Sequence, residues 1–429
     1  MSRLLLFMLS TVCLASCDAV GSGRSDDAAV PGRVTVQDGI RLLDVAAPSP
    51  GRDRGLKPDG TWAGDLPLVA ISDAKLLGDG MAVLVDERGA EAWLVPLAPG
   101  TATRFSARGG GPGESQLPLA GVPTQDGILL WDAGRQTFSL FQESGQLRLA
   151  VSQPEDGDTD RFNRRLANAR RQSNHQLRVR AAGDAVWFLL EDDEFEIAGP
   201  PGSSTGTIEV PRRGYLTRLA SDFRSADTVL TFQATTRYLE PGSPSSGAGV
   251  FEWERLWTVG DSLIAIGRSD SAVVTILRTD RKPVAVVRWP AVHRPITRDD
   301  KRGHARAIVR ERGWAFPAEA RDETMLMEAA DRMQTVEFAP ELTGIELLGR
   351  CLWLSPFDVR DNSDGVSRTW WYYDLETGAG RSVTFDSEAV RPMHFTARFV
   401  LARRVEEDER HSIRRYSLPE RVRSDCGLR

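Results

Sequence analysis

The sequence predicts an all-β fold, and two observations lead to this prediction. A Gly-Asp or Asp-Gly turn recurs along the chain, and each copy is followed by a short apolar segment and then by a more alternating one. These segments are rich in β-branched, aromatic and aliphatic residues and are bounded by Gly, Asp or Pro, which is typical of short strands. The chain therefore contains a repeated unit of two strands.

This unit occurs six times, although the last two copies are degenerate. In the clearest copy, Gly78-Asp79-Gly80 leads into the apolar segment 81–86, and the second segment follows at 92–95. The remaining copies lie within residues 126–141, 183–219, 260–277, 349–374 and 399–416.

Six sheets stacked radially would bury both faces of each sheet against its neighbours, which describes a six-bladed β-propeller over residues 33–420. The first strand of each unit is apolar on both faces, so we expect it to be an inner strand, and the second to lie nearer the outside. The copies are further apart than the roughly 40–50 residues of an ordinary blade, which predicts inserted loops. The alternative is a set of unrelated antiparallel sheets, such as two sandwiches.

Closure of the ring requires the two ends of the chain to meet. The segment Val34-Thr35-Val36 alternates and lies far in sequence from the last unit. We expect it to pair with the strand at 412–418, so that one blade contains both termini.

One insertion, at about 297–334, is predicted to be a small helical hairpin. Thr297 and Asp300 have the spacing of a capping box with Asp in place of Glu, and Gly313 suits a helix end. A second helix is expected to begin near Pro317. The hairpin either packs on the propeller or acts as a lid or docking element at one mouth of the ring.

The N-terminus carries the signature of export. Arg3 precedes the apolar run 4–14, which is too short to span a bilayer, and small residues then precede Cys17. The segment Leu14-Ala15-Ser16-Cys17 resembles the lipobox of bacterial lipoproteins, which implies a signal peptide at 1–17 and lipidation of Cys17. The alternative is an ordinary cleaved secretory signal in which Cys17 occurs by chance.

Residues 18–32 are predicted to be a flexible tether, because they contain almost no large apolar side chain that could offset the ordering entropy. A lipidated Cys17 followed by a tether places the protein in the bacterial cell envelope, with the membrane as a partner. The sequence does not distinguish the periplasmic side of the inner or outer membrane from the cell surface.

The composition excludes one class of partner. The formal net charge is −6, and acidic and basic residues are interspersed, so nucleic acid is not expected to bind. We expect a monomer. Cys351 and Cys426 remain after signal cleavage in an oxidising compartment. They either pair or stay as thiols, since Cys351 lies in an apolar strand and Cys426 in the polar C-terminal tail at 421–429.

Several segments resemble catalytic or ligand-binding motifs, but we interpret each of them as a loop or turn. The pattern G-x-S-x-G at 202–206 lacks the strand and helix that a nucleophile elbow needs. The Gly-rich segment 108–114 lacks the Lys-Ser/Thr of a P-loop, and we interpret it as a tight loop between blades. The acidic run at 192–196 and the segment 361–365 are interpreted as a solvated loop and a turn.

The histidines show no paired metal-ligand spacing, so each is interpreted as structural or solvated, although a propeller could bring distant ones together: His175, His293, His304, His394 and His411. Four tryptophans are expected in the cores of the blades: Trp131, Trp187, Trp353 and Trp371.

The Gly-rich loop and the two strands after it resemble a known family. The stretch 105–114, followed by 129–132 and 138–141, resembles the six-bladed β-propeller proteins related to NHL-repeat domains, which include secreted and lipid-anchored bacterial proteins. Ser115 departs from the pattern, because the family tends to have an aromatic residue there. The resemblance implies a propeller but provides no catalytic residues.

The sequence therefore favours a lipid-anchored propeller that acts as a binding module, with a protein or small molecule bound at one mouth of the ring. The alternative is a propeller enzyme, a lyase, lactonase or other hydrolase, with a metal or carboxylate site at the channel mouth. No catalytic or metal-binding residue is assigned, and no cofactor is expected; calcium or zinc would be the cation of the enzyme alternative.

Overall fold

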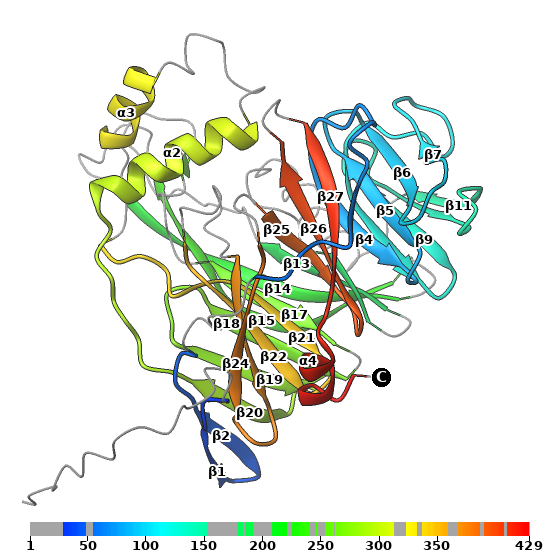
Figure 1. Cartoon of the computed structure of the whole chain (residues 1–429). Helices are drawn as coiled ribbons and strands as arrows, with labels where there is room; N and C mark the ends of the chain where they lie inside the picture. The colour runs from blue at the N-terminus through cyan, green and yellow to red at the C-terminus, as the bar shows by residue number, and fades with distance from the viewer. Residues whose placement is uncertain are drawn as a thin grey trace, which may run out of the picture.

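The chain forms a six-bladed β-propeller with a small helical insertion (Figure 1). This computed structural model describes residues 29–48, 55–152, 179–182, 185–191, 208–220, 225–239, 246–247, 254–260, 262–312, 323–332, 337–358, 368–386, 390–406 and 410–428. The predicted signal peptide at 1–17 lies outside these residues.

The first three blades follow one another along the chain. Blade 1 contains β4 (Ile71–Leu77), β5 (Met81–Asp86), β6 (Glu91–Pro96) and β7 (Thr103–Ser106). Blade 2 contains β8 (Pro118–Thr124), β9 (Gly127–Asp132), β10 (Thr137–Phe141) and β11 (Leu147–Ser152). Blade 3 contains β12 (Val179–Ala182), β13 (Ala185–Glu191), β14 (Ile208–Leu219), β15 (Ala226–Leu239) and β16 (Ser246–Gly247).

Two of the last three blades include strands from the N-terminal region. Blade 4 contains β17 (Arg255–Val259), β18 (Leu263–Arg268), β19 (Val273–Arg278) and β20 (Pro283–Arg288), extended by β2 (Ile40–Asp44) and β1 (Arg33–Gln37). Blade 5 contains β21 (Leu342–Leu348), β22 (Cys351–Pro356), β23 (Thr369–Asp374) and β24 (Gly380–Thr384). Blade 6 contains β25 (Val390–Phe395), β26 (Phe399–Val405), β27 (His411–Ser417) and β3 (Gly60–Trp62).

The repeated pair of strands predicted from the sequence is the second and third strand of every blade. The innermost strands are β4, β8, β12, β17, β21 and β25, and they contact one another around most of the ring. One further strand lines the channel in each blade, and the second strand of each predicted unit lies nearer the outside, as expected. The first strand of each unit is an inner strand, also as expected. That strand is apolar on both faces because it is covered by a neighbouring blade on each side.

Ring closure joins both ends of the chain in blade 6, but through a different segment from the one predicted. Thr61 of β3 pairs with Arg414 of β27 in an antiparallel register. The segment around Val34 lies instead in β1, which pairs with β2. β2 in turn runs parallel to β20 at the outer edge of blade 4, so the N-terminal hairpin enlarges a blade that is already complete.

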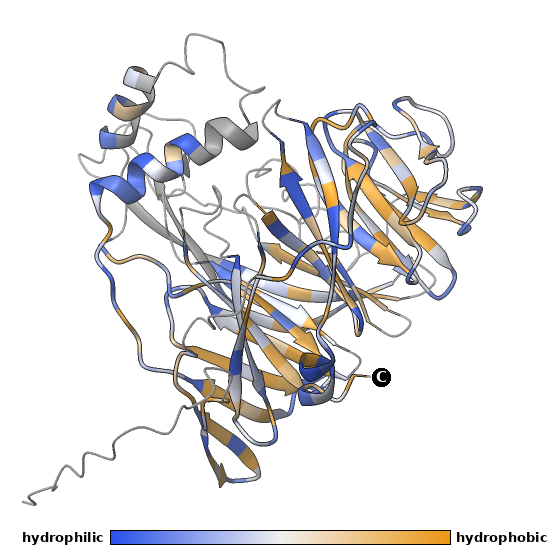
Figure 2. Ribbon diagram, in the orientation of Figure 1, coloured by the Kyte–Doolittle hydropathy of each residue, from blue (hydrophilic) through white to orange (hydrophobic). Residues whose placement is uncertain are grey.

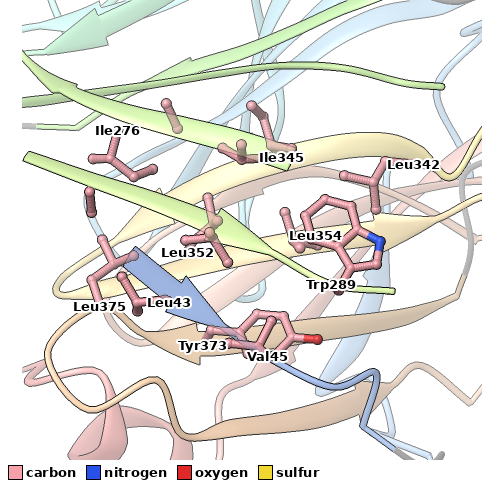
Figure 3. Packing of buried hydrophobic residues seen from close by; sticks show 14 of the residues in the cluster. Leu43, Val45, Ile276, Trp289, Leu342, Ile345, Leu352, Leu354, Tyr373 and Leu375 are labelled. Atoms are coloured by element: carbon pink, nitrogen blue, oxygen red, sulfur yellow. The ribbon is translucent and has the colours of Figure 1, made fainter. Parts of the chain in front are cut away.

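Apolar side chains fill the spaces between neighbouring blades. Figure 3 shows one such cluster, in which Leu43 of β2 and Ile276 of blade 4 pack near Leu352 and Leu354 of blade 5. In Figure 2 the strands of the blades carry most of the hydrophobic residues, and the described part of α2 (Arg298–Arg312) is mainly hydrophilic. Three of the four tryptophans predicted in blade cores are almost fully buried: Trp131, Trp187 and Trp353. Trp371 is half-buried, and its neighbour Trp370 takes the buried face of β23.

Two aspartates explain why Asp follows the apolar strand in the first two units. Asp132 ends β9, and its carboxylate accepts hydrogen bonds from the backbone amides of Gln116 and Leu117, at 2.8 and 2.9 Å, in the connection that enters the blade. It also accepts from Gly134 and Arg135 in its own turn, at 2.8 and 3.3 Å. Asp86 at the end of β5 accepts from four amides in the same arrangement: Val69, Ala70, Arg88 and Gly89. Each carboxylate fastens the entry of a blade to its first turn.

The predicted helical hairpin is confirmed. α2 and α3 (Glu323–Arg332) lie in the connection between blades 4 and 5. The backbone amide and hydroxyl of Thr297 donate to Asp300 at 2.9 and 2.7 Å, and the Asp300 amide donates back to the Thr297 hydroxyl, which completes the capping box. Asp331 of α3 forms ion pairs with Arg298 and Arg302 of α2.

The two cysteines form a disulfide. Cys351 in β22 bonds to Cys426, which follows α4 (Glu420–Asp425), and the two Cα atoms are 5.1 Å apart. Both cysteines are fully buried, as is Val422 of α4. Residues 421–428, predicted as a tail, thus contain most of a helix that packs against blade 5.

Candidate functional site

The connections between strands divide the ring into two unequal faces. Strands alternate in direction within each antiparallel sheet, so successive connections emerge on opposite faces. From β4 to β27, with the two-residue strand β16 counted as part of the connection from β15 to β17, every connection longer than six residues leaves the same face. These connections, which define the long-connection face, are 107–117, 153–178, 192–207, 240–254, 289–341 and 357–368.

The connections on the opposite face, here called the short-turn face, are brief turns such as 78–80, 142–146 and 279–282. The C-terminal helix α4 also lies there, beside the turn 349–350. Binding and catalytic groups in proteins concentrate on loops that a rigid scaffold holds in place. The long-connection face is therefore the candidate functional face of this propeller.

The channel itself contains charged residues from the innermost strands. Asp73 and Lys75 of β4 form an ion pair, and the other carboxylate oxygen of Asp73 accepts a hydrogen bond from the backbone amide of Gly121 in β8, at 3.2 Å. Asp73 and Lys75 are 7% and 6% exposed. This pair links blade 1 to blade 2.

A second pair reaches across blade 4. Arg180 of β12 in blade 3 forms an ion pair with Glu346 of β21 in blade 5. The second carboxylate oxygen of Glu346 accepts a hydrogen bond from the hydroxyl of Thr258 in β17, at 2.9 Å. Glu346 thus joins the inner strands of three blades, and a buried carboxylate with both oxygens bonded is well satisfied.

His394 of β25 completes this group of residues. Its Nδ1 accepts a hydrogen bond from the Leu76 amide of β4, at 2.9 Å, so blade 6 is joined to blade 1. Burial, together with the positive charges of Lys75 and Arg180, holds the pKa of His394 well below its usual value. The imidazole is therefore neutral at neutral pH and carries its proton on Nε2.

We name these six residues the channel belt: Asp73, Lys75, Arg180, Thr258, Glu346 and His394. Most of them come from the later half of an inner strand, which is the half nearer the short-turn face. Because Asp73, Lys75, Thr258 and Glu346 are at most 8% exposed, little water reaches this level of the channel. The belt links the inner strands of neighbouring blades beneath the long-connection face.

The Gly-rich segment 108–114 is a tight loop between blades 1 and 2, as predicted. The Gly109 amide donates to the carbonyl of Ser115, and Gly113 has a φ of +78°, which glycine adopts without strain. Ser115, where the related propellers tend to have an aromatic residue, is fully buried and its hydroxyl lies 2.6 Å from that of Ser106. The buried position is thus filled by a contact between two hydroxyls.

The described histidines do not form a common site. His411 accepts a hydrogen bond on Nδ1 from the Ile71 amide, so it and His394 are both structural contacts of β4. His293 and His304 lie in the helical insertion. His175, the G-x-S-x-G pattern at 202–206, the acidic run at 192–196 and the segment 361–365 lie outside the described residues. Within the described part of the chain, no group of three or more His, Cys, Asp and Glu residues could hold a metal ion.

Sequence reasoning found His394 but missed the other five residues of the channel belt. They lie on inner strands whose sequences do not alternate, such as Ile71–Leu77, in which Asp, Ala and Lys interrupt the apolar pattern. A charged residue in the short segment that precedes each predicted strand pair is the sequence signal that could have identified the charged members of the belt.

Comparison with known proteins adds a likeness in fold. No protein-family model matches the chain, and no curated protein matches it. Among solved structures, an exported protein from Bacteroides fragilis is similar over 88% of this chain and 99% of its own, at 10% identity and a TM-score of 0.46.

Two enzymes also appear among the similar structures. A streptogramin B lyase matches 84% of this chain and 87% of its own, at 9% identity and a TM-score of 0.37. A gluconolactonase from Xanthomonas campestris matches 94% of this chain and 100% of its own, at 13% identity and a TM-score of 0.35. No residue role is carried over from these proteins.

Proposed function

We propose that this protein is a lipid-anchored component of the bacterial cell envelope and that its propeller binds a ligand on the long-connection face. The observation that carries the binding proposal is the asymmetry of the ring. The strands that precede the long connections all end at one mouth, and the channel belt links the inner strands of neighbouring blades beneath that mouth.

The buried disulfide supports the compartment. Cys351 and Cys426 pair inside the fold, and disulfides persist in oxidising compartments such as the periplasm and the cell surface. The N-terminal segment ending in Cys17 supports attachment to lipid. Among the described residues, the helices fall short of the length and apolar character that crossing a bilayer requires.

The anchor is tested by growing cells with an alkyne-tagged fatty acid and isolating the protein. Wild-type protein should carry the tag and sediment with membranes, and the Cys17→Ser variant should lose both properties. A soluble, untagged wild-type protein would contradict the lipid anchor and leave the binding proposal standing.

Binding is tested by a thermal-shift screen of purified protein against sugars, carboxylates, amino acids and nucleotides. A ligand at about 100 times its Kd stabilises the folded state by about 2.7 kcal/mol, which raises the melting temperature measurably. Replacing the connection 153–178 by a short Gly-Ser linker should abolish the shift, whereas Ser144→Ala on the short-turn face should not. A shift that survives the loop replacement and disappears in the Ser144 variant would contradict the proposal. Stoichiometric calcium or zinc in the purified protein would instead favour the enzyme class.

A further inference from the structure

We infer that the propeller is held edge-on at the lipid surface, with the outer rim of blades 4 and 5 toward the bilayer and both mouths of the ring open to water. This inference rests on the proposed lipid anchor at Cys17. It adds a surface, a lipid-facing rim, that the anchor alone does not specify.

The chain enters the fold at the rim. Val30 and Gly380 exchange backbone hydrogen bonds of 2.8 and 2.9 Å, and Gly380 begins β24, the outermost strand of blade 5. Gly32 lies so close to Gly378 that a Cβ there would stand 2.3 Å from the Gly378 carbonyl oxygen. The first described residues are therefore fixed against an outer strand, away from the channel.

The next element lies at the same rim. β1 is the outermost strand of the six-stranded sheet of blade 4. Val36 of β1 is 68% exposed, and Arg33 and Arg41 of the hairpin are also exposed. Val36 lies opposite Arg41 in the register of the hairpin, and an exposed apolar residue beside an arginine suits the interface of a bilayer, where basic side chains meet lipid headgroups. Figure 1 shows β1 and β2 at the bottom of the view, far from α2 and α3 at the top.

The reach of the tether keeps this rim close to the lipid. About twelve residues separate Cys17 from Ala29, and they span at most about 40 Å when fully extended. A flexible segment of this length has a root-mean-square span of about 20 Å. Strands spaced about 4.8 Å apart make two opposite blades at least about 40 Å wide, so the far rim stays well away from the surface.

The described turns of the short-turn face offer no apolar anchor for the bilayer, although Arg281 and Lys282 in the turn 279–282 are exposed. None of the exposed large hydrophobic side chains of the described residues lies in its turns. Charged residues occupy these turns, and several form ion pairs with arginines of the fold: Asp79, Asp126, Asp280 and Glu376. Flat attachment by this face would cost desolvation of these charges without burying apolar surface.

The inference is tested by energy transfer from single labels to acceptor-tagged lipids. Full-length protein is purified from membranes and reconstituted into vesicles of phosphatidylethanolamine and phosphatidylglycerol. Lys282→Cys and Ala98→Cys place a maleimide dye in equivalent turns of blades 4 and 1, on the same face and at opposite sides of the ring. The native disulfide and a lipidated Cys17 do not react with the dye. Val292→Cys reports the long-connection face, since Val292 is 74% exposed there.

Edge-on attachment predicts about twofold or more greater energy transfer from position 282 than from position 98, because the ring is at least about 40 Å wide. Equal transfer from the two positions would mean that the propeller lies flat and would overturn the inference, as would the strongest transfer from position 292. Inserting thirty Gly and Ser residues after Ser25 should abolish the difference while the protein stays on the vesicles. Failure of the wild-type protein to associate with vesicles would contradict the lipid anchor itself.

Discussion

His411, in the last blade, accepts a hydrogen bond on Nδ1 from the backbone amide of Ile71, in the first blade, at 2.8 Å and across 340 positions of sequence. His394 does the same for the Leu76 amide, five residues further along β4. The inner strand of blade 1 is thus held near both ends by imidazoles of blade 6. Each imidazole accepts through an unprotonated nitrogen, so the contacts require the neutral form.

We expect acid to weaken the fold through these contacts. Burial, with a smaller effect of Arg403, lowers the pKa of His411 from 6.5 to about 3. Between these values the unfolded chain binds a proton that the folded chain does not, so stability falls as the pH falls from about 6.5 towards 3. The loss from His411 alone is about 1.4 kcal/mol per pH unit, or about 2 kcal/mol at pH 5.

Urea unfolding at several pH values measures this effect. In His411→Gln the side-chain amide cannot titrate, so the slope of stability against pH between 5 and 6.5 should decrease by about one proton. Ser144→Ala, which changes an exposed residue without a titratable group, should leave the slope unchanged. An unaltered slope in His411→Gln would show that His411 is protonated in the folded state.

Asp132→Ala should be among the most destabilising substitutions outside the apolar core. Four backbone amides donate hydrogen bonds to this carboxylate, and all four lose their acceptor in the variant. The loss should cost about 3–5 kcal/mol of unfolding free energy. Asp126→Ala removes only an exposed carboxylate 3.6 Å from Arg148, so its unfolding free energy should stay within about 0.5 kcal/mol of wild type. Equal effects of the two substitutions in chemical denaturation would contradict the role given to Asp132.

Truncation of the channel belt should be costly and insensitive to salt. Glu346→Ala leaves the half-buried Arg180 without its carboxylate and removes the acceptor of Thr258, which should destabilise the fold by about 3 kcal/mol. Ion screening has little effect on buried pairs, so the loss should be the same at low and high salt. Asp280→Ala, which breaks an exposed pair with Arg278, serves as the control and should change stability little. A Glu346→Ala protein as stable as wild type would show that the belt does not hold the blades together.

The disulfide should contribute strongly to stability because it closes a long loop. Cys351 and Cys426 are 75 positions apart, and a loop of this length predicts about 4 kcal/mol from restriction of the unfolded chain. The double variant Cys351→Ser and Cys426→Ser should have a lower unfolding midpoint in urea, by the amount that corresponds to this loss of about 4 kcal/mol. If reduction of the wild-type protein left its midpoint unchanged, α4 would be held by its other contacts alone, such as the hydrogen bond from Tyr372 to Asp425.

The architecture was accessible from sequence because the second and third strands of each blade are apolar. They are covered on both faces by neighbouring blades, so segments such as Ile128–Asp132 stand out between their turns. The helical insertion was accessible for a different reason. The capping box at Thr297 and Asp300 is local and works through hydrogen bonds within four residues.

The inner strands could not be predicted from the sequence, because they line the channel and lack the continuous apolar pattern of a strand covered on both faces. β8 contains two prolines and a glycine, and a Cβ at Gly121 would lie 2.9 Å from Val83 and Val85 of blade 1. Glu346 is charged because it meets Arg180 of another blade, which no local pattern reveals. The closing strand β3 is only three residues long, too short to predict from its composition.

Blade 6 cannot be assembled until the ribosome has made its last strand, because β3 occupies residues 60–62 and its partner β27 ends at Ser417. During most of synthesis the sixth sheet is therefore missing, and a partly made ring exposes apolar surface on blades 1 and 5. A nascent chain of this kind benefits from a holding chaperone until its final segment arrives.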